Sequence, residues 1–244
     1  MSASATPDPS VTFAPRRARS RAFATHWPVR LGDCGPDGRL RPDGLVRYLQ
    51  DVASDDWIDT GLPPGPTWLV RHAAVRLTPG ARWPELGDEV TLTTWCSGTG
   101  AAWAERRTDI AVAGECRLET VTLWVSVGPS GRPVRLDAGF FAAYGESAQR
   151  KVSARVSLAS PPPDAERRPW PLRRSDLDVV GHINNAALWS PLVELAAAPL
   201  TFARVIHHAP VTGDDAPELV VAGTRWWLTV QQLVHVEGVY ALGG

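Results

Sequence analysis

A polar segment of eleven residues, SDLDVVGHINN at positions 175–185, contains side chains that can do acid–base chemistry. Asp178 and His182 stand four positions apart, and Asn184 and Asn185 follow directly. A carboxylate with a raised pKa, or an imidazole at its ordinary pKa, can take a proton from water near neutral pH. The next fifteen residues are almost without charge. The pattern predicts a reactive loop at the N-terminus of a buried apolar helix.

Each of these side chains also has a purely structural interpretation, and both interpretations stay open. Asp178 is typical of an Asx turn, and Asn184 is a typical helix N-cap. His182 is compatible with a hydrogen-bonded core position, and Asp176 with an ion pair to a neighbouring arginine. No further ligand spacing supports a metal site built on Asp176, Asp178 and His182. We therefore expect neither a metal nor another cofactor.

Composition limits the class of protein. The chain has 244 residues and a net charge of −1, which argues against a general nucleic-acid binder. Its three cysteines form no CxxC pair, so reduced thiols in a cytoplasmic protein are expected. No apolar run approaches the roughly 20 residues needed to span a bilayer. Residues 1–22 are rich in Ser, Ala, Pro and Arg without an apolar stretch, which predicts a disordered tail rather than a secretory signal.

The elements that position the reactive loop repeat within the chain. A shift of 143 residues places 26–51 on 169–194 without a gap, and a related match downstream makes the second copy the shorter one. Each copy has a short strand, a polar loop ending in glycine, and a helix. The identical pairs include Trp27 with Trp170, Pro28 with Pro171, Arg30 with Arg173, Asp33 with Asp176, Gly38 with Gly181 and Leu45 with Leu188.

The patterns downstream of both loops predict an α+β architecture. Each half continues with a helix and then about four segments rich in β-branched or aromatic residues, bounded by Gly or Pro. Residues 137–145 predict a short helix between an Asp N-cap and a terminal Gly. In the second half a helix is expected over about 184–197, apolar enough to be buried nearly all round, with Glu194 on a buried face. These features predict two curved antiparallel sheets, each wrapped around a central helix.

The domain limits follow from this repeat and from one linker. The three prolines and the charges of 159–168 predict a linker between a first unit at 23–158 and a second at 169–244.

The ordered motifs resemble those of the acyl-ACP thioesterases, a family of double hotdog proteins. RRSDLDVVGHINNAALW…LVE is similar to the signature of the second half of that family, and VRYLQDVASDDW, WLVRHAAVRL, GDEVTLTTWCSG and TLWVSVGPSGRPVRL follow its order in the first half. The resemblance implies a tandem hotdog fold and hydrolysis of fatty acyl thioesters on acyl carrier protein or coenzyme A. It also implies that Asp178 and His182 are catalytic, with Asn184 and Asn185 opening the second helix.

Thioester hydrolysis needs an activated water and hydrogen-bond donors for the oxyanion. The first backbone N–H groups of a helix have no partner within it and carry partial positive charge. We therefore expect the N–H groups near Asn184 to Ala187 to stabilise the oxyanion, with Asp178 or His182 as the base.

Two positions depart from the family pattern. Val180 stands where the plant enzymes have a catalytic Asn, and Ile206 is the expected counterpart of a family Glu. These departures keep a second hypothesis open, an acyl-binding or regulatory protein with weakened turnover. A dehydratase acting on a hydroxyacyl thioester is a third.

The first half has lost the reactive pair, since Gly35 and Arg39 occupy the places of Asp178 and His182. This half is therefore expected to hold the acyl chain, and an arginine pair is expected to dock the acidic carrier protein. A tandem hotdog is compatible with a monomer or a homodimer. The expected lining residues are Trp57, Trp68 and Trp95, with Glu194 as a further candidate, and the docking candidates are Arg106 with Arg107 or Arg173 with Arg174.

Overall fold

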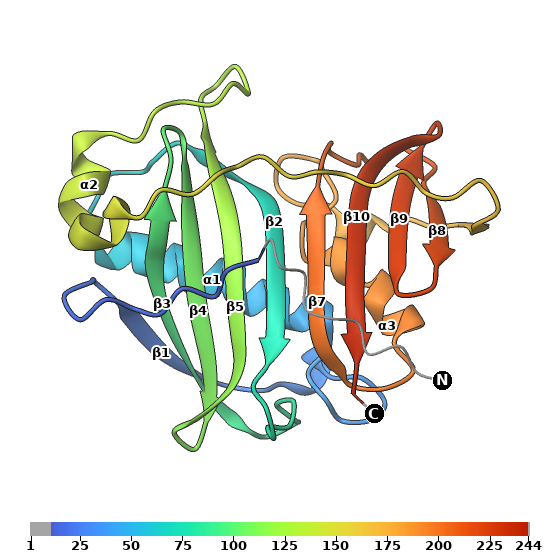
Figure 1. Cartoon of the computed structure of the whole chain (residues 1–244), viewed down its shortest axis with the longest axis horizontal. Coiled ribbons are helices and arrows are strands. Elements are labelled where there is room, and N and C mark those ends of the chain that lie inside the picture. The colour runs from blue at the N-terminus through green and yellow to red at the C-terminus, as the bar shows by residue number, and fades with distance from the viewer. Residues whose placement is uncertain (1–10, 244) are drawn as a thin grey trace.

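The computed structural model describes residues 11–243 of the chain, and a single ten-stranded antiparallel sheet runs through it (Figure 1). The strand order is β1-β3-β4-β5-β2-β7-β10-β9-β8-β6. The first half contributes β1 (Phe23–Pro28), β2 (Thr67–Leu77), β3 (Glu89–Thr99), β4 (Trp103–Val112) and β5 (Glu115–Val127). The second contributes β6 (Glu166–Pro169), β7 (Leu200–His207), β8 (Glu218–Ala222), β9 (Arg225–Val230) and β10 (Leu233–Leu242).

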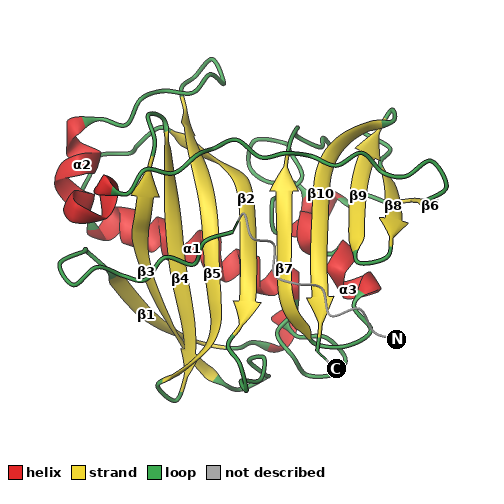
Figure 2. Ribbon diagram, in the orientation of Figure 1, coloured by secondary structure: helices red, strands yellow, loops and turns green. Residues whose placement is uncertain are grey.

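The two halves have the same internal strand order and meet at β2 and β7. These strands pair antiparallel from His72 with Ile206 to Arg76 with Phe202. In each half the first strand lies at the outer edge and the second at the junction, so an approximate twofold axis passes between β2 and β7. The central helices of both halves lie on one face of the sheet, called here the inner face (Figure 2). This arrangement confirms the predicted tandem hotdog fold.

The central helix of the first half, α1 (Pro42–Asp59), is long and well formed. Proline near its start suits the first turn, where an N–H would have no partner. Leu45, Leu49 and Val52 recur at helical spacing and are fully or almost fully buried against the sheet. Helix α1 therefore forms the core of this half.

The second central helix is shorter than predicted. In place of one helix over 184–197, the structure has a 3₁₀ turn, η4 (Ala187–Trp189), and α3 (Pro191–Leu195). Pro191 has no N–H to donate to the Ala187 carbonyl, which instead accepts the Ser190 hydroxyl at 2.6 Å. Glu194 is exposed on this short helix, so its predicted position on a buried face is wrong.

The short helix predicted at 137–145 is present as α2 (Ala138–Tyr144). The Asp137 carboxylate accepts the Phe140 N–H at 2.8 Å, as an N-cap does. Gly145, at φ 42°, ends the helix and begins η2 (Gly145–Gln149). Two further 3₁₀ turns, η1 (Leu31–Asp33) and η3 (Arg174–Asp176), precede the polar loops of the two halves.

Two segments without regular structure cross the outer face of the sheet, opposite the helices (Figure 1). One follows α2 and is held by the indole N–H groups of Trp103 and Trp227, which donate to the carbonyls of Val152 and Ala159. The other is 11–22, the described part of the expected tail.

Residues 11–22 have defined contacts with the sheet and with α1. The Phe13 ring lies 4.3 Å from the Arg76 guanidinium and 5.3 Å from that of Arg107. Arg21 forms ion pairs with Asp56 and Asp59 of α1. These cation–π contacts and ion pairs give a polar, Arg-rich stretch a fixed position. Residues 1–10 of the expected tail lie outside the described part of the chain.

Among residues 11–243, no helix is both long and apolar enough to cross a bilayer.

Replacing Asp137 with Ala should lower the free energy of unfolding by about 1 kcal/mol, because the Phe140 N–H loses its acceptor. Urea unfolding followed by circular dichroism measures this change. Asp164→Ala, at an exposed position of the linker, is the matched control and should leave the midpoint unchanged. An equal effect of both substitutions would contradict the capping role.

Candidate active site

The segment 177–183 forms a tight loop closed by its own backbone. The Asp178 N–H donates to the His182 carbonyl at 2.7 Å, and the Gly181 N–H donates to the Asp178 carbonyl at 3.1 Å. Gly181 has φ of 81°, a conformation that a residue with a Cβ adopts only with strain. Backbone hydrogen bonds and a left-handed glycine therefore close the loop.

The Asp178 carboxylate also holds the loop. Its Oδ1 accepts the N–H groups of Val180 at 3.0 Å and His182 at 3.1 Å, the pattern of an Asx turn. Within residues 11–243, its Oδ2 accepts no hydrogen bond. One oxygen thus has a structural role, and the other remains available to a water molecule.

The first half contains the same loop with different side chains. Gly35 donates to the Arg39 carbonyl at 2.8 Å, just as Asp178 donates to that of His182. Each loop is also anchored from a neighbouring segment, by Leu40 N–H to Pro84 in the first half and by Ile183 N–H to Val211 in the second. The 143-residue repeat is thus preserved as a set of equivalent hydrogen bonds.

The start of the second helix has both used and unused donors. Asn184 Oδ1 accepts the Ala186 N–H at 2.8 Å, and the Asn184 carbonyl accepts the Leu188 N–H. Among residues 11–243, the N–H groups of Asn185 and Ala187 have no acceptor. Because η4 and α3 are short, these two groups act as individual donors and not as the end of a long helix dipole.

The His182 side chain is half-buried, and its backbone forms a bridge with Thr212. Within the described chain, the imidazole ring of His182 makes no hydrogen bond to the Asp178 carboxylate. The two groups therefore do not form a preassembled dyad in this ligand-free structure. Within the same residues, no cluster of three or more His, Cys, Asp and Glu side chains is arranged to hold a metal.

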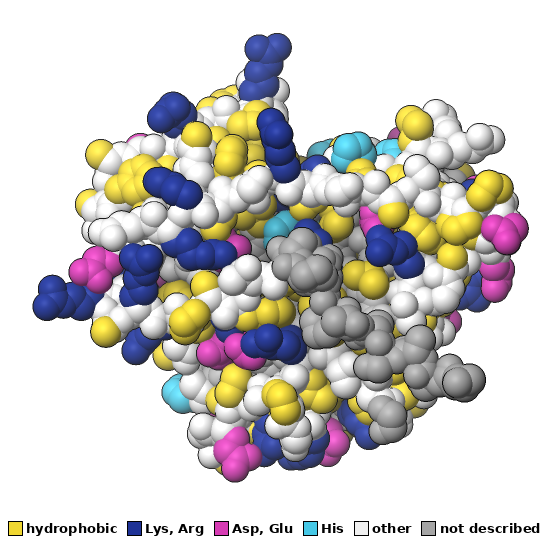
Figure 3. Space-filling view, viewed as in Figure 1, with side chains coloured by type: hydrophobic (Ala, Val, Ile, Leu, Met, Phe, Trp, Pro, Cys, Tyr) yellow, Lys and Arg dark blue, Asp and Glu magenta, His cyan; other side chains and the backbone are white. Residues whose placement is uncertain are grey.

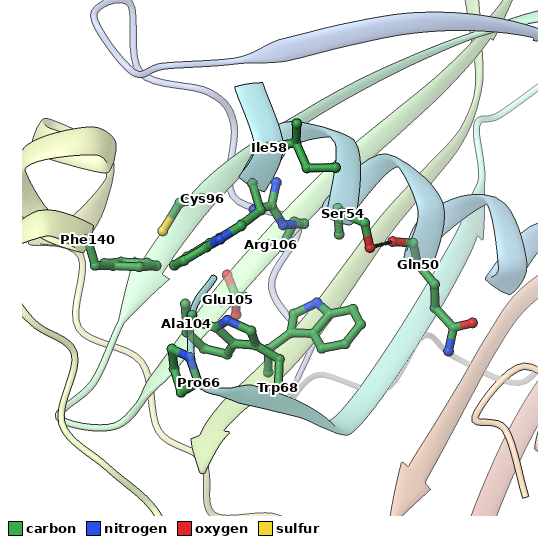
Figure 4. A pocket seen from close by; sticks show the side chains of 14 residues that line it. Gln50, Ser54, Ile58, Pro66, Trp68, Cys96, Ala104, Glu105, Arg106 and Phe140 are labelled. Carbon is green, nitrogen blue, oxygen red and sulfur yellow. Dashed lines mark hydrogen bonds between the residues drawn. The ribbon is translucent and has the colours of Figure 1, made fainter. Parts of the chain in front are cut away.

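A cavity of about 290 Å³ lies in the first half, between α1 and the inner face of β2–β5 (Figure 4). Trp57 and Trp68 line it, with ring centroids 6.2 Å apart. Burial raises the pKa of the Cys96 thiol to about 11, so this cavity-lining group stays protonated at neutral pH. The remaining lining residues are Gln50, Ala53, Ser54, Ile58, Gly65, Pro66, Ala104, Glu105, Arg106, Trp124 and Phe140.

Trp95 does not line this cavity. Neighbouring residues of a strand face opposite sides of the sheet, so Cys96 on the inner face places Trp95 on the outer face. There its ring lies 5.1 Å from the Arg107 guanidinium. The sequence predicts Trp95 as a lining residue, but the register of β3 places Cys96 at the cavity in its stead.

A second cavity of about 290 Å³ lies between the first-half loop and α3. Gly35, Asp37 and Arg39 line it from the loop. The helix side comes from Val193, Ala196 and Ala197. Neither Asp178 nor His182 lines the first cavity.

Ile206, the expected counterpart of the family Glu, is buried and pairs across the sheet with His72 and Glu237. Glu237 is a buried acid that the sequence does not single out, but its carboxylate is occupied by Arg225 and by the Ala159 N–H. It therefore has a structural role on the outer face.

His207 at the end of β7 is buried, and the next residue, His208, is exposed. Burial, with a smaller contribution from the nearby Arg71 guanidinium, lowers the pKa of His207 to about 4. Within residues 11–243 neither ring nitrogen of His207 has a hydrogen-bond partner. His207 is thus a neutral imidazole at physiological pH.

The four docking arginines divide into two pairs. Arg106 and Arg107 are enclosed by the fold and held by ion pairs, so they cannot dock a partner. Arg173 and Arg174 are exposed immediately before the loop 177–183.

Comparison with known proteins gives a family-model match and a relative of known sequence. Residues 20–138 match the model of the acyl-ACP thioesterase N-terminal domain. An uncharacterized protein of Mycobacterium tuberculosis strain H37Rv is 27% identical over 191 residues, covering 77% of this chain and 75% of that protein.

Solved structures of low identity share the fold. A presumed oleoyl thioesterase of Lactobacillus plantarum has a TM-score of 0.78 and 18% identity, over 93% of this chain and 99% of that one. The 12:0-ACP thioesterase of Umbellularia californica has a TM-score of 0.73 and 16% identity, over 90% and 96%.

The buried neutral His207 should make stability depend on pH. Because its folded pKa is about 4 and its unfolded pKa about 6.5, the unfolded chain gains a proton first as pH falls. The contribution of His207 to the free energy of unfolding, on the order of 3 kcal/mol, should be present above pH 6.5 and lost towards pH 4. Urea midpoints of wild type and His207→Gln across this window measure it.

His208→Gln is the control, because this neighbour is exposed. The difference in urea midpoint between wild type and His207→Gln should shrink as pH falls. The midpoint of His208→Gln should follow that of wild type throughout. A constant difference for His207→Gln would rule out the proton-linked contribution.

Proposed function

We propose that this chain, whose residues 20–138 form an N-terminal domain of the acyl-ACP thioesterase family, hydrolyses fatty acyl thioesters at the loop 177–183. It is a thioester hydrolase of the acyl-ACP thioesterase type. The acyl group would lie in the first-half cavity, and the thioester would lie beside Asp178 and His182.

The observation that carries this proposal is the approximate twofold symmetry of the two halves. In the second cavity, loop residues 35–39 of the first half lie across from the end of α3. Moving the loop forward by 143 residues gives 178–182. Moving Val193 of α3, with Ala196 and Ala197 just beyond its end, back by 143 gives positions on α1. Those positions are Gln50, Ala53 and Ser54, and all three line the first cavity.

The reactive loop is therefore expected to face the end of the cavity that Gln50 forms. Figure 4 shows Gln50 at the opposite end of the cavity from Cys96 and Phe140. An acyl chain entering past Gln50 would run between α1 and the sheet and leave its thioester at the loop. The largely aromatic and aliphatic lining supports binding of an acyl chain.

We assign the general base to His182, with Asp178 holding the attacking water through its free Oδ2. Imidazole is the side chain most often used as a general base near neutral pH. The N–H groups of Asn185 and Ala187, which have no acceptor within residues 11–243, would donate to the oxyanion. Asn184 would fix this turn through its bond to the Ala186 N–H.

The presence of Val180 in the reactive loop favours a second function, acyl binding with weak turnover. Its side chain is 62% exposed at the position of the family's catalytic Asn and cannot hydrogen-bond to a substrate. A protein that keeps the cavity but lacks this hydrogen bond would still bind the acyl group and would hydrolyse the thioester slowly or not at all.

Arg173 and Arg174 are the preferred docking residues for an acidic carrier protein. They are exposed and adjoin the reactive loop. Figure 3 shows further Lys and Arg side chains on the outer face of the first half, but that face lies on the other side of the sheet from α1 and the cavity. A carrier docked there would not reach the loop.

The proposal is tested by steady-state hydrolysis of a C8 to C18 acyl-ACP panel. Asp178→Asn keeps an Oδ1 acceptor for the loop but removes the charge, so turnover should fall at least about 100-fold with folding intact. His182→Ala should lose a similar factor. Wild-type rates equal to the enzyme-free blank on every chain length would leave acyl binding as the function.

The matched control is Asp37→Asn in the first-half loop. Asp37 Oδ1 accepts the Arg39 N–H at 3.0 Å, so the substitution repeats the same chemical change in an equivalent loop. It should leave turnover within about twofold of wild type. A loss as large as that of Asp178→Asn would contradict the assignment of chemistry to the second half.

Charge reversal of Arg173 and Arg174 to Glu should raise KM for acyl-ACP and leave KM for the matching acyl-pantetheine nearly unchanged, because pantetheine is a neutral carrier with neither the acidic surface of the protein nor the phosphates of coenzyme A. The KM increase should diminish at high salt. Equal KM changes for both carriers would assign these arginines to the acyl thioester itself.

A further inference from the structure

The first-half cavity contains one feature that an unsubstituted fatty acyl chain does not use. Arg106 lines a space otherwise walled largely by aromatic and small side chains, and 13% of its side-chain surface is accessible (Figure 4). Its guanidinium lies on the inner face of β4, between α1 and the sheet. The aromatic part of the wall consists of Trp57, Trp68, Trp124 and Phe140.

The guanidinium is only partly satisfied by the protein. Its Nη1 donates to Asp56 Oδ2 at 2.7 Å and to Thr94 Oγ1 at 3.1 Å, and its Nη2 donates to the Tyr144 hydroxyl at 3.3 Å. A guanidinium has five N–H groups. Within residues 11–243 the remaining two, including Nε–H, have no acceptor, and an apolar chain packed against them would leave them without one.

The charge of the cluster decides what kind of acceptor fits. Asp56 is 1% exposed and pairs with both Arg106 and Arg21, and Arg21 also pairs with Asp59. Two arginines thus face two aspartates, and the cluster is neutral. A carboxylate ligand would add an uncompensated buried charge, whereas a hydroxyl or keto oxygen would add a hydrogen bond at no cost in charge.

We propose that the cavity selects acyl groups that carry a neutral oxygen, a hydroxyl or keto group, at the chain position that reaches Arg106. The aliphatic remainder packs against the aromatic wall. This inference rests on the proposed function for the identity of the ligand as an acyl thioester, and it narrows the substrate class from fatty acyl to oxygenated acyl groups.

The test is direct binding to the full-length protein. Decanoate is compared with decanoates hydroxylated at C6, C8 or C10, and binding is followed by quenching of tryptophan fluorescence, since three tryptophans line the cavity. At least one hydroxydecanoate should bind about tenfold tighter than decanoate, as expected for one hydrogen bond to a charged donor. Decanoate binding as tightly as all three, or no binding by any, would overturn the proposal.

Two variants at position 106 connect the preference to this side chain. Arg106→Lys keeps the charge beside Asp56 and removes the extra N–H groups, so the hydroxydecanoate preference should fall to about twofold or less. Arg106→Met should abolish it. Arg76→Met removes an arginine from the outer face, outside the cavity, and should keep the full preference.

If Arg106→Met does not fold, wild type and Arg106→Lys still decide the matter. An undiminished preference in a folded Arg106→Lys would overturn the role of Arg106.

Hydrolysis of the matching acyl thioesters separates this inference from the proposed function. Turnover of both decanoyl and hydroxydecanoyl thioesters with equal kcat/KM, and no binding preference, would remove the inference and keep the thioesterase. A binding preference for the hydroxydecanoate without turnover of either thioester would remove the enzyme assignment and keep the oxygen-binding cavity.

Discussion

The pairing of β2 with β7 is the constraint on which the rest of the structure depends. Each half alone would end in a strand with a free row of backbone N–H and carbonyl groups, and such edges are unfavourable when long and apolar. Joining them buries both and makes one sheet of ten strands. The Trp83 indole adds a buried bond across the junction, donating to the Leu200 carbonyl at 2.6 Å. The junction fixes which loop faces which helix.

The two polar loops show how one geometry supports two chemistries. Their shape comes from backbone hydrogen bonds and from glycine at the turn, as in Gly38 and Gly181, both with positive φ. Because these bonds do not depend on the other side chains, the second loop can hold Asp178 and His182 where the first has Gly35 and Arg39. The two central helices divide the roles further. The long α1 of the first half encloses the aromatic cavity, whereas η4 and α3 of the second half are short.

Buried charge is the other organising feature of the first half. Arg107 is 1% exposed and is held on the outer face by Asp109 and Glu119 beneath the segment containing Phe13. Arg106, its neighbour, points to the inner face and pairs with Asp56. Segment 11–22 therefore contributes to two charge clusters, through Phe13 beside Arg107 on the outer face and through Arg21 beside Asp56 of α1. Arginines that look like a surface patch in the sequence are thus internal parts of the fold.

The sequence alone determines the repeat, most of the strand-forming segments, the α2 cap at Asp137, and the reactive side chains at Asp178 and His182. These depend on local patterns: period-two alternation, glycine at turns, and a polar acceptor before a helix. Tertiary structure decides the rest. The inner or outer position of Trp95 depends on strand register. The partnership of Arg106 with Asp56, 50 residues away, depends on α1 lying against β4. Such long-range contacts leave no periodic signal in one chain, because they are set by which elements the sheet brings together.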